Sequence, residues 1–187
     1  MMSRRWPLQG GGSAGHSPRM QRRSLLKLGA ASAAVLTIAG GGGALMNPGL
    51  AAGGLSAGAR EVFRAVGEAI LDGSLPAASA ARTAAVEGML ERIEGVVSAL
   101  PAHSQKELSL LLGLLASAPG RHTITGLRAR WVDADIPQVQ QALQVMRTSA
   151  MSLRQQAYHA LHDIVGGAYF SDPGTWAQLG YPGPLNI

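Results

Sequence analysis

The sequence predicts an all-α protein, and three observations lead to this fold class. Apolar residues recur at the three-and-four spacing of a helix through most of the chain after residue 55. No segment alternates apolar and polar residues like a half-buried strand, and no repeat of fixed period occurs. Cysteine is absent, so apolar packing must stabilise the fold without disulfides or thiolate metal sites. We expect a compact bundle of five or six helices, preceded by a disordered leader and a signal helix and followed by an extended aromatic tail.

The first 20 residues are rich in glycine, serine, proline and arginine and show no apolar period. We therefore expect this segment to be disordered. Gly10 to Gly15 match the pattern Gly-x-Gly-x-x-Gly, which is typical of dinucleotide-binding loops. No strand precedes the match, no helix follows it, and the next acidic residue is Glu61. A dinucleotide site is therefore rejected.

A paired arginine opens directly into a weakly apolar, alanine-rich run that ends at Ala39. Two neighbouring guanidiniums present planar charged groups to a receptor, and the apolar run can enter a membrane. The pattern resembles a twin-arginine (Tat) export signal, in which Leu25 stands where phenylalanine is commoner. The residues that carry the resemblance are Arg22, Arg23, Leu25, Leu26 and Lys27. The resemblance implies recognition by the twin-arginine translocase and export to the periplasm after folding.

The same arginines have a simpler interpretation, because signals of the general secretion route also contain paired arginines. The apolar run from residue 25 to 39 is shorter than the roughly 20 residues of a transmembrane helix, so retention as an anchor is the less favoured alternative. Small residues at Leu50-Ala51-Ala52 offer a cleavage site. We therefore divide the chain into a signal region, residues 1–52, and a helical domain, residues 53–187.

The charge of the chain is concentrated in the signal region. Of the 16 basic and 11 acidic residues, six basic residues and no acidic ones lie in residues 1–52. The helical domain is therefore almost neutral, and the high overall pI does not indicate nucleic-acid binding. Charged residues are also sparse in the domain, which suggests that another protein covers part of its surface.

Three helices are expected in the first half of the domain. The first runs from Leu55 to a stop at Asp72-Gly73 and buries Val62, Phe63, Val66 and Ile70. The second spans the apolar positions from Val86 to Leu100 and ends at Pro101. The third, residues 108–116, is apolar almost all round and follows a capping box at Ser104-Gln105-Lys106-Glu107. We expect this third helix at the centre of the core.

The second half of the domain contains the longest apolar stripe of the chain. Pro119-Gly120 interrupts the pattern, and a short helix is expected over residues 127–132. The stripe then runs from Ile136 to Ala168, with Pro137 in its first turn. It predicts either one helix of about 50 Å or two helices broken near Thr148-Ser149.

The carboxyl end is rich in aromatic residues, glycine and proline. Asp172 and Pro173 could cap a short helical turn that carries Trp176, and an extended tail follows. The aromatics Trp176 and Tyr181 either pack over the end of the bundle or anchor a partner protein, and both can hold at once. The predicted partner interface consists of Tyr169, Phe170, Trp176 and Tyr181.

The twin-arginine leader, the Phe63-containing helix and the ending Asp-Pro-x-x-Trp-x-x-x-Gly-Tyr-Pro-Gly-Pro resemble the gluconate 2-dehydrogenase subunit 3 family. The resemblance covers residues 22–27 and about 55–184, and the tail is its most specific part. Members are small subunits of membrane-associated dehydrogenases. The resemblance implies a non-catalytic escort for an FAD-bearing large subunit of the glucose-methanol-choline type, often with a cytochrome c subunit. No cofactor is then expected in this chain.

Other candidate sites are weighed against simpler interpretations. His159, His162 and Asp163 share one helix face and could hold a metal, but three ligands on one helix rarely converge, so a solvated face or a His-Asp pair is favoured. Asp133 and Asp135 are interpreted as helix caps. The remaining candidates are interpreted as loop histidines, His103 and His122, and as a solvated face formed by Arg128 and Arg130 around Trp131.

Three functional hypotheses remain. The leading one is the exported escort subunit. The alternative is a stand-alone periplasmic helical binding protein without an enzyme partner. The third is a catalytic protein that uses the cluster His159, His162 and Asp163.

Overall fold

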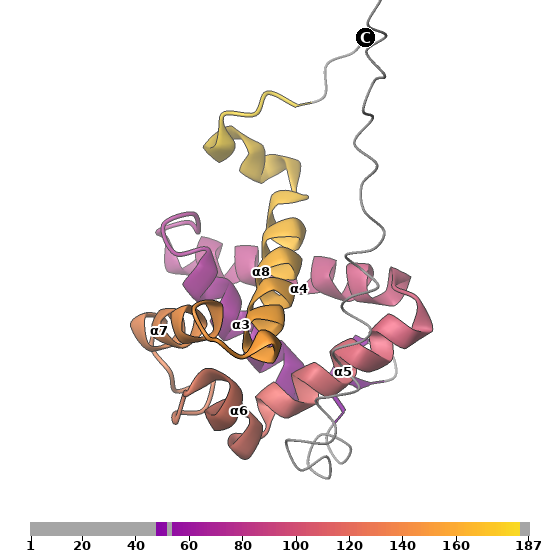
Figure 1. Ribbon diagram of the computed structural model, residues 1–187. Coiled ribbons are helices and arrows are strands. Elements are labelled where there is room, and N and C mark those ends of the chain that lie inside the picture. The colour runs from indigo at the N-terminus through magenta and orange to yellow at the C-terminus, as the bar shows by residue number, and fades with distance from the viewer. Residues whose placement is uncertain (1–47, 52–53, 184–187) are drawn as a thin grey trace, which may run out of the picture.

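The computed structural model describes residues 48–51 and 54–183, and this part of the chain is mainly helical (Figure 1). The mostly-α fold class is confirmed. None of the described helices is long and apolar enough to cross a membrane. The elements are β1 (Leu50–Ala51), β2 (Gly54–Leu55), α3 (Ala57–Ile70), α4 (Ser79–Ala99), α5 (Ala102–Ala116), α6 (Ala118–Thr125), α7 (Ile136–Arg147), α8 (Ser152–Phe170) and the 3-10 helix η1 (Pro173–Leu179). The predicted export signal and the glycine pattern at residues 10–15 lie outside the described residues.

Helix α3 lies at the centre of the fold, where α4, α5, α7 and α8 all pack against it. Val62, Phe63 and Val66 on its buried face have no exposed surface. Ser56 begins the helix, because its hydroxyl accepts a hydrogen bond from the Ala59 N–H. The predicted helix and its buried face are confirmed, with Ile70 half-buried at its end.

Helix α4 buries the predicted apolar stripe but begins at Ser79, seven residues before the stripe. Its polar face is tied to α3 by ion pairs. Arg60 contacts both Glu87 and Glu94, and Arg64 also contacts Glu87. These ion pairs fix the position of α4 against the central helix.

Helix α5 begins earlier than predicted, and the predicted capping box is wrong. The helix starts at Ala102 with Pro101 as its N-cap, so Ser104 lies inside the first turn and caps nothing. Proline suits this boundary because a helix start does not need its missing N–H. Residues 108–116 contain no exposed residue, as expected, but the helix at the centre of the core is α3.

The short helix of the second half lies before the predicted one. Residues 127–132 form a loop and a turn, and the helix is α6. Ser117 caps α6 through its hydroxyl, Pro119 occupies its first turn, and Gly126 ends it in the left-handed conformation, with φ 77°. Two of the apolar residues that suggested a helix, Leu127 and Trp131, are instead buried from the loop, whereas Val132 is exposed. Trp131 is 3% exposed, and its indole N–H donates to the Leu115 carbonyl at 2.8 Å.

The long apolar stripe forms two helices, α7 and α8, so of the two predicted alternatives the one with a break near Thr148-Ser149 is correct. Asp135 caps α7 in a reciprocal capping box with Gln138, and Pro137 lies in the first turn. The buried positions of the two helices include Leu143, Met146 and Leu161. Because the chain turns between the helices, both can pack against α3.

A small antiparallel hairpin precedes α3, and the sequence analysis did not predict it. In it Leu50 is paired with Leu55 and Ala51 with Gly54. The strand β1 packs against α5. Residues 49–51 therefore belong to the packed body, although they precede the domain boundary drawn at residue 52.

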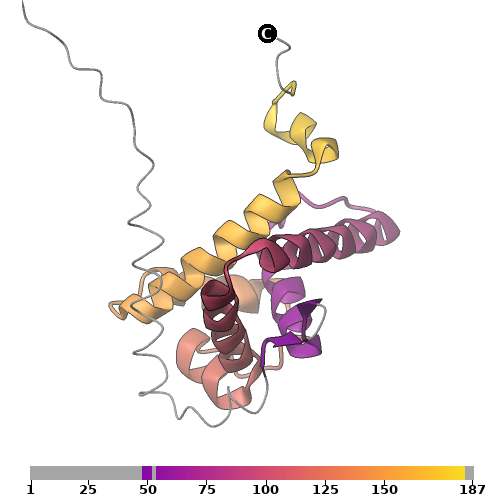
Figure 2. The ribbon, with the colours of Figure 1, turned by 90° about the vertical axis from the view of Figure 1, so that its right-hand side faces the viewer.

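The last element projects away from the helical body. In two perpendicular views, η1 continues beyond the end of α8 and stands clear of the other helices (Figures 1 and 2). Among the described elements, η1 packs mainly against α8. The carboxyl-terminal segment is thus presented outward.

Candidate functional site

The candidate site is built where α8 meets η1. The last turn of α8 is anchored in the core by Tyr169, which is 2% exposed and donates its hydroxyl proton to the Ser74 carbonyl at 2.9 Å. The ring of Phe170 meets the Tyr169 ring edge-on, with centroids 5.1 Å apart. The base of the projecting segment is therefore rigid.

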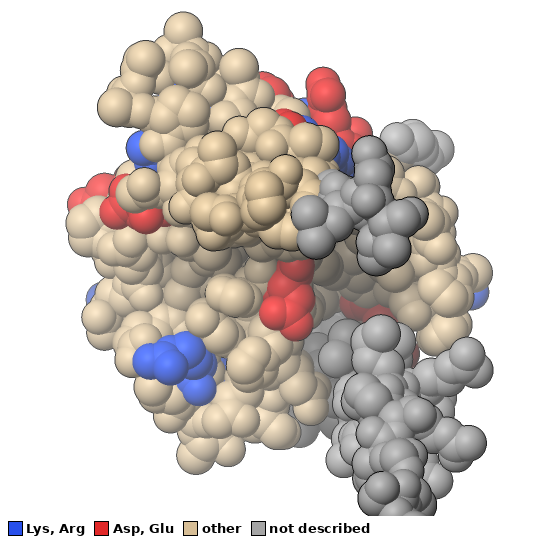
Figure 3. All heavy atoms as spheres, turned by 90° about the horizontal axis from the view of Figure 1, so that it is seen from above, with Lys and Arg blue, Asp and Glu red and all other residues tan. Residues whose placement is uncertain are grey.

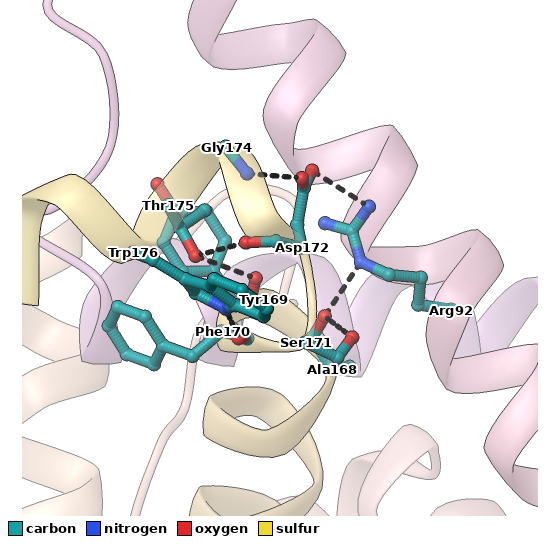
Figure 4. Close-up of polar contacts among 9 residues, drawn as sticks. All are labelled: Arg92, Ala168, Tyr169, Phe170, Ser171, Asp172, Gly174, Thr175 and Trp176. Atoms are coloured by element: carbon teal, nitrogen blue, oxygen red, sulfur yellow. Dashed lines mark hydrogen bonds and ion pairs between the residues drawn. The ribbon is translucent and has the colours of Figure 1, made fainter. Parts of the chain in front are cut away.

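An arginine from α4 holds this junction from the side (Figure 4). Arg92 Nε donates to the Ala168 carbonyl at 2.7 Å, and its Nη1 lies 3.3 Å from Asp172 Oδ2. The Ala168 carbonyl also accepts from the Ser171 hydroxyl at 2.9 Å. One guanidinium thus tethers both the end of α8 and the start of η1 to α4.

Asp172 and Thr175 shape the first turn of η1. Asp172 Oδ1 accepts from the Gly174 N–H at 2.9 Å, which confirms the predicted cap. Thr175 is 7% exposed, and its hydroxyl donates to the Asp172 carbonyl at 2.7 Å. The side chain of Asp172 therefore serves two elements at once, η1 through the cap and α4 through Arg92.

The outer end of the segment carries an apolar surface. The indole N–H of Trp176 donates to the Phe170 carbonyl at 2.9 Å, which fixes the ring against the end of α8. Tyr181 packs edge-on against Trp176 at 5.2 Å, and Gly180 reverses the chain between them with φ 67°. Tyr181 is 48% exposed and Leu179 57% exposed. We call Trp176, Leu179 and Tyr181 the tail surface.

The face of the molecule seen from above carries few charges (Figure 3). Seen from above, most of the visible described surface is uncharged, with acidic and basic side chains at scattered positions (Figure 3). A rigid, partly exposed aromatic group is typical of a protein-binding surface, since tryptophan and tyrosine dominate interface energetics.

The four residues predicted for the interface have different positions. Trp176 and Tyr181 lie together on the outside, Phe170 is half-buried beneath them, and Tyr169 belongs to the core. Sequence reasoning missed Leu179 and the two residues that orient the segment, Arg92 and Thr175. The pattern of α4 gave no signal for Arg92, because its partners lie 76 and 80 residues away.

The histidine cluster lies on a solvated face of α8. His159, His162 and Asp163 are all exposed, and His162 Nδ1 lies 3.3 Å from Asp163 Oδ1. Both histidine rings also contact the ring of Tyr158. In the described part of the chain, no three His, Cys, Asp or Glu side chains are grouped so that they could hold a metal ion.

The other candidates have structural positions. Asp135 caps α7 as predicted, but Asp133 is no cap, since it forms a double ion pair with Arg130. His103 and His122 lie in helices α5 and α6 rather than in loops. Trp131 is buried, so the expected solvated face around it consists of its exposed neighbours Arg128 and Arg130.

Perturbed acids in the described residues belong to surface ion pairs. The Arg64 hydrogen bond, with the charges of Arg64 and Arg60, lowers the pKa of Glu87. The hydrogen bond from Arg130 lowers the pKa of Asp133, and the same contact raises the pKa of Arg130. Each shift favours the charged form of a residue that takes part in an ion pair, as expected for ion pairs with a structural role.

A groove of about 510 Å³ runs between the connection after α6 and helix α7. The residues that line it include Leu127, Arg128, Ala142, Asp135 and Gln138. The side chains of Asp135 and Gln138 are both engaged in the capping box of α7, so these two residues do not form a free acid–base pair.

Comparisons with protein-family models, curated proteins and solved structures find no match to this chain.

Proposed function

We propose that this chain is an exported, non-catalytic small subunit that binds a folded FAD-dependent dehydrogenase. The partner is a large subunit of the glucose-methanol-choline type, which carries the flavin and the catalytic residues. The small subunit supplies the twin-arginine signal, escorts the partner into the periplasm and remains bound, at the periphery of the inner membrane. A cytochrome c subunit completes the complex as the electron acceptor.

The proposal combines two independent supports. The first is the sequence resemblance carried by Arg22 and Arg23 in the leader and by the motif from Asp172 to the end of the tail. The second is the geometry of the tail surface, which is the observation that carries the argument. The surface projects from the body, its base is held by Tyr169 and Arg92, and it leaves two large apolar side chains half-exposed.

A pre-organised aromatic surface suits a binding partner better than it suits a free monomer. Exposed Leu179 and Tyr181 would gain from burial, and little conformational freedom is lost because the segment is already ordered by caps and hydrogen bonds. An interface of standard size covers about 800 Å² on each partner, so the tail surface would form its core and neighbouring uncharged surface its rim. The proposal also includes a signal helix that precedes the compact helical bundle.

The test uses the full chain, tagged at its carboxyl end and isolated from the periplasm. We expect it to co-purify with a large subunit that shows flavin absorbance. The double variant Leu179→Ala/Tyr181→Ala should weaken the complex by about 30-fold or more, since loss of a central interface residue costs about 2 kcal/mol or more. Trp176 is left in place because its indole is part of the fold of the tail.

The matched control is Val132→Ala, which removes an equally exposed apolar side chain outside the tail. It should leave the affinity within about twofold of wild type. If the double variant retains its flavoprotein as well as the control does, the tail surface is not the interface. Protein that arrives alone and without flavin supports the stand-alone binding protein, and metal-dependent turnover by the isolated chain supports the catalytic alternative.

Replacement of Arg22 and Arg23 by lysines tests the export step. The charge is kept but the planar guanidiniums are lost. Both this subunit and its flavoprotein should then remain in the cytoplasm, as shown by fractionation and flavin assay. Unchanged export of both proteins would rule out the twin-arginine route.

A further inference from the structure

The residues just before the first helix are bonded to α5. The Gly49 N–H donates to the Ser109 carbonyl at 3.0 Å, and the Leu50 N–H donates to the Ser109 hydroxyl at 3.0 Å. The Gly49 carbonyl accepts from the Ser56 N–H at 2.9 Å, at the start of α3. We call residues 49–51 the strap, because they join α5 to the beginning of the central helix.

The strap fits α5 closely. Gly49 is buried, and a Cβ atom built on it would lie 2.4 Å from Leu112 Cβ and 2.6 Å from the Ser109 carbonyl oxygen. Only glycine allows this approach without displacing the strand. Leu50 packs against the core, and its pairing partner Leu55 is 8% exposed. The strap is thus part of the packed body, and the N–H groups of Gly49 and Leu50 are both hydrogen-bonded to Ser109.

The cleavage site predicted from the sequence, Leu50-Ala51-Ala52, overlaps this strap. Tolerance to cutting depends on the burial and hydrogen bonding of the affected backbone. A peptidase that binds its substrate as an extended segment would have to pull residues 49–51 off α5 and break the two bonds to Ser109. By contrast, residues 39–44 are all alanine or glycine and directly follow the apolar run, as expected of a cleavage region.

We propose that the leader is removed on the amino-terminal side of Gly49, so that the mature protein keeps the strap bound across α5. This inference rests on the proposed export, but it does not depend on which protein is carried.

The decisive measurement is the amino-terminal residue of the protein isolated from the periplasm, by intact mass and terminal sequencing. We expect the mature chain to begin at or before Gly49. A chain that begins at Leu50 or later, or that reaches the periplasm uncleaved, overturns the inference while leaving the escort function standing. A chain that stays in the cytoplasm overturns the proposed export, and the inference with it.

A second measurement tests whether the strap is docked, independently of processing. Hydrogen exchange of the Gly49 and Leu50 amides should be slow in the wild-type protein and at least about 10-fold faster in Gly49→Ala, whose new methyl group displaces the strap. The matched control is Gly95→Ala, because a Cβ at Gly95 meets nothing within 4 Å. Exchange that is equally fast in wild type and Gly49→Ala would show that the strap is not held on α5.

Discussion

Replacement of Arg92 by methionine should detach the carboxyl-terminal segment from α4. Methionine keeps much of the apolar stem but removes the donors to the Ala168 carbonyl and to Asp172. A hydrogen bond from a charged donor contributes about 1.5–3 kcal/mol, and the lower end applies because Ser171 still donates to the same carbonyl. The ion pair, with side chains 30% and 42% exposed, adds at most about 1 kcal/mol.

We therefore expect Arg92→Met to lower the free energy of unfolding by about 2 kcal/mol and Tm by about 6 °C. Urea denaturation followed by circular dichroism measures the first quantity. The variant should also weaken binding of the flavoprotein, since the tail surface loses its fixed orientation. A loss of stability below about 0.5 kcal/mol would refute the role assigned to this guanidinium.

The variant Asp172→Asn separates the two functions of that side chain. Asparagine caps a helix about as well as aspartate, so the bond to the Gly174 N–H is kept while the charge facing Arg92 is lost. The expected cost is therefore only about 0.5 kcal/mol. A cost equal to that of Arg92→Met would show that the contact with Ala168 contributes little.

Two further predictions concern stability. Arg64 lowers the pKa of Glu87 below its ordinary value of 4.5, so the α3–α4 ion pairs stabilise the fold above pH 4.5 and are lost as the pH falls through the folded-state pKa. Urea denaturation measured from pH 6 to 3 should therefore show a smaller loss of stability with falling pH for Glu87→Gln than for the wild type. Parallel stability curves for the two proteins would contradict this. Gly126→Ala should destabilise the protein by about 1 kcal/mol because φ is 77° there, whereas Gly95→Ala on exposed α4 surface should stabilise it by about 0.5–1 kcal/mol. Thermal unfolding of both variants measures these effects. If Tm changes in the same direction in Gly126→Ala and Gly95→Ala, the positive φ of Gly126 does not explain the cost.

Local signals in the sequence predicted the helices with few errors. Apolar spacing marked the buried faces of α3 and α4, and Asp135, Pro137 and the polar residues near Thr148 marked the start and end of α7. These predictions hold because caps and helix periodicity involve residues within four positions of one another. The cap at Asp172 was found for the same reason.

The errors occurred where burial overrode local preference. Trp131 and Leu127 suggested a short helix, but both are apolar residues of a loop that the core draws in. Ser104 matched a capping box, yet the helix had already begun after Pro101. The position of a helix start or a loop depends here on which parts of the distant chain are available for packing, and a short stretch of sequence carries no information about them.

By itself the sequence determined the mostly helical class and the unusual composition of the tail, since both follow from short-range spacing and chain chemistry. It left open whether the long stripe forms one helix or two, and the tertiary structure decided for two. Only the tertiary structure decided that α3 is central, that residues 49–51 belong to the body and that Arg92 orients the tail. The hydrogen bonds that place residues 49–51 and Arg92 join residues 59, 76 and 80 positions apart, and α3 is central because four other helices pack against it. Contacts at such separations form only when the whole core assembles, so they leave no periodic trace in the chain.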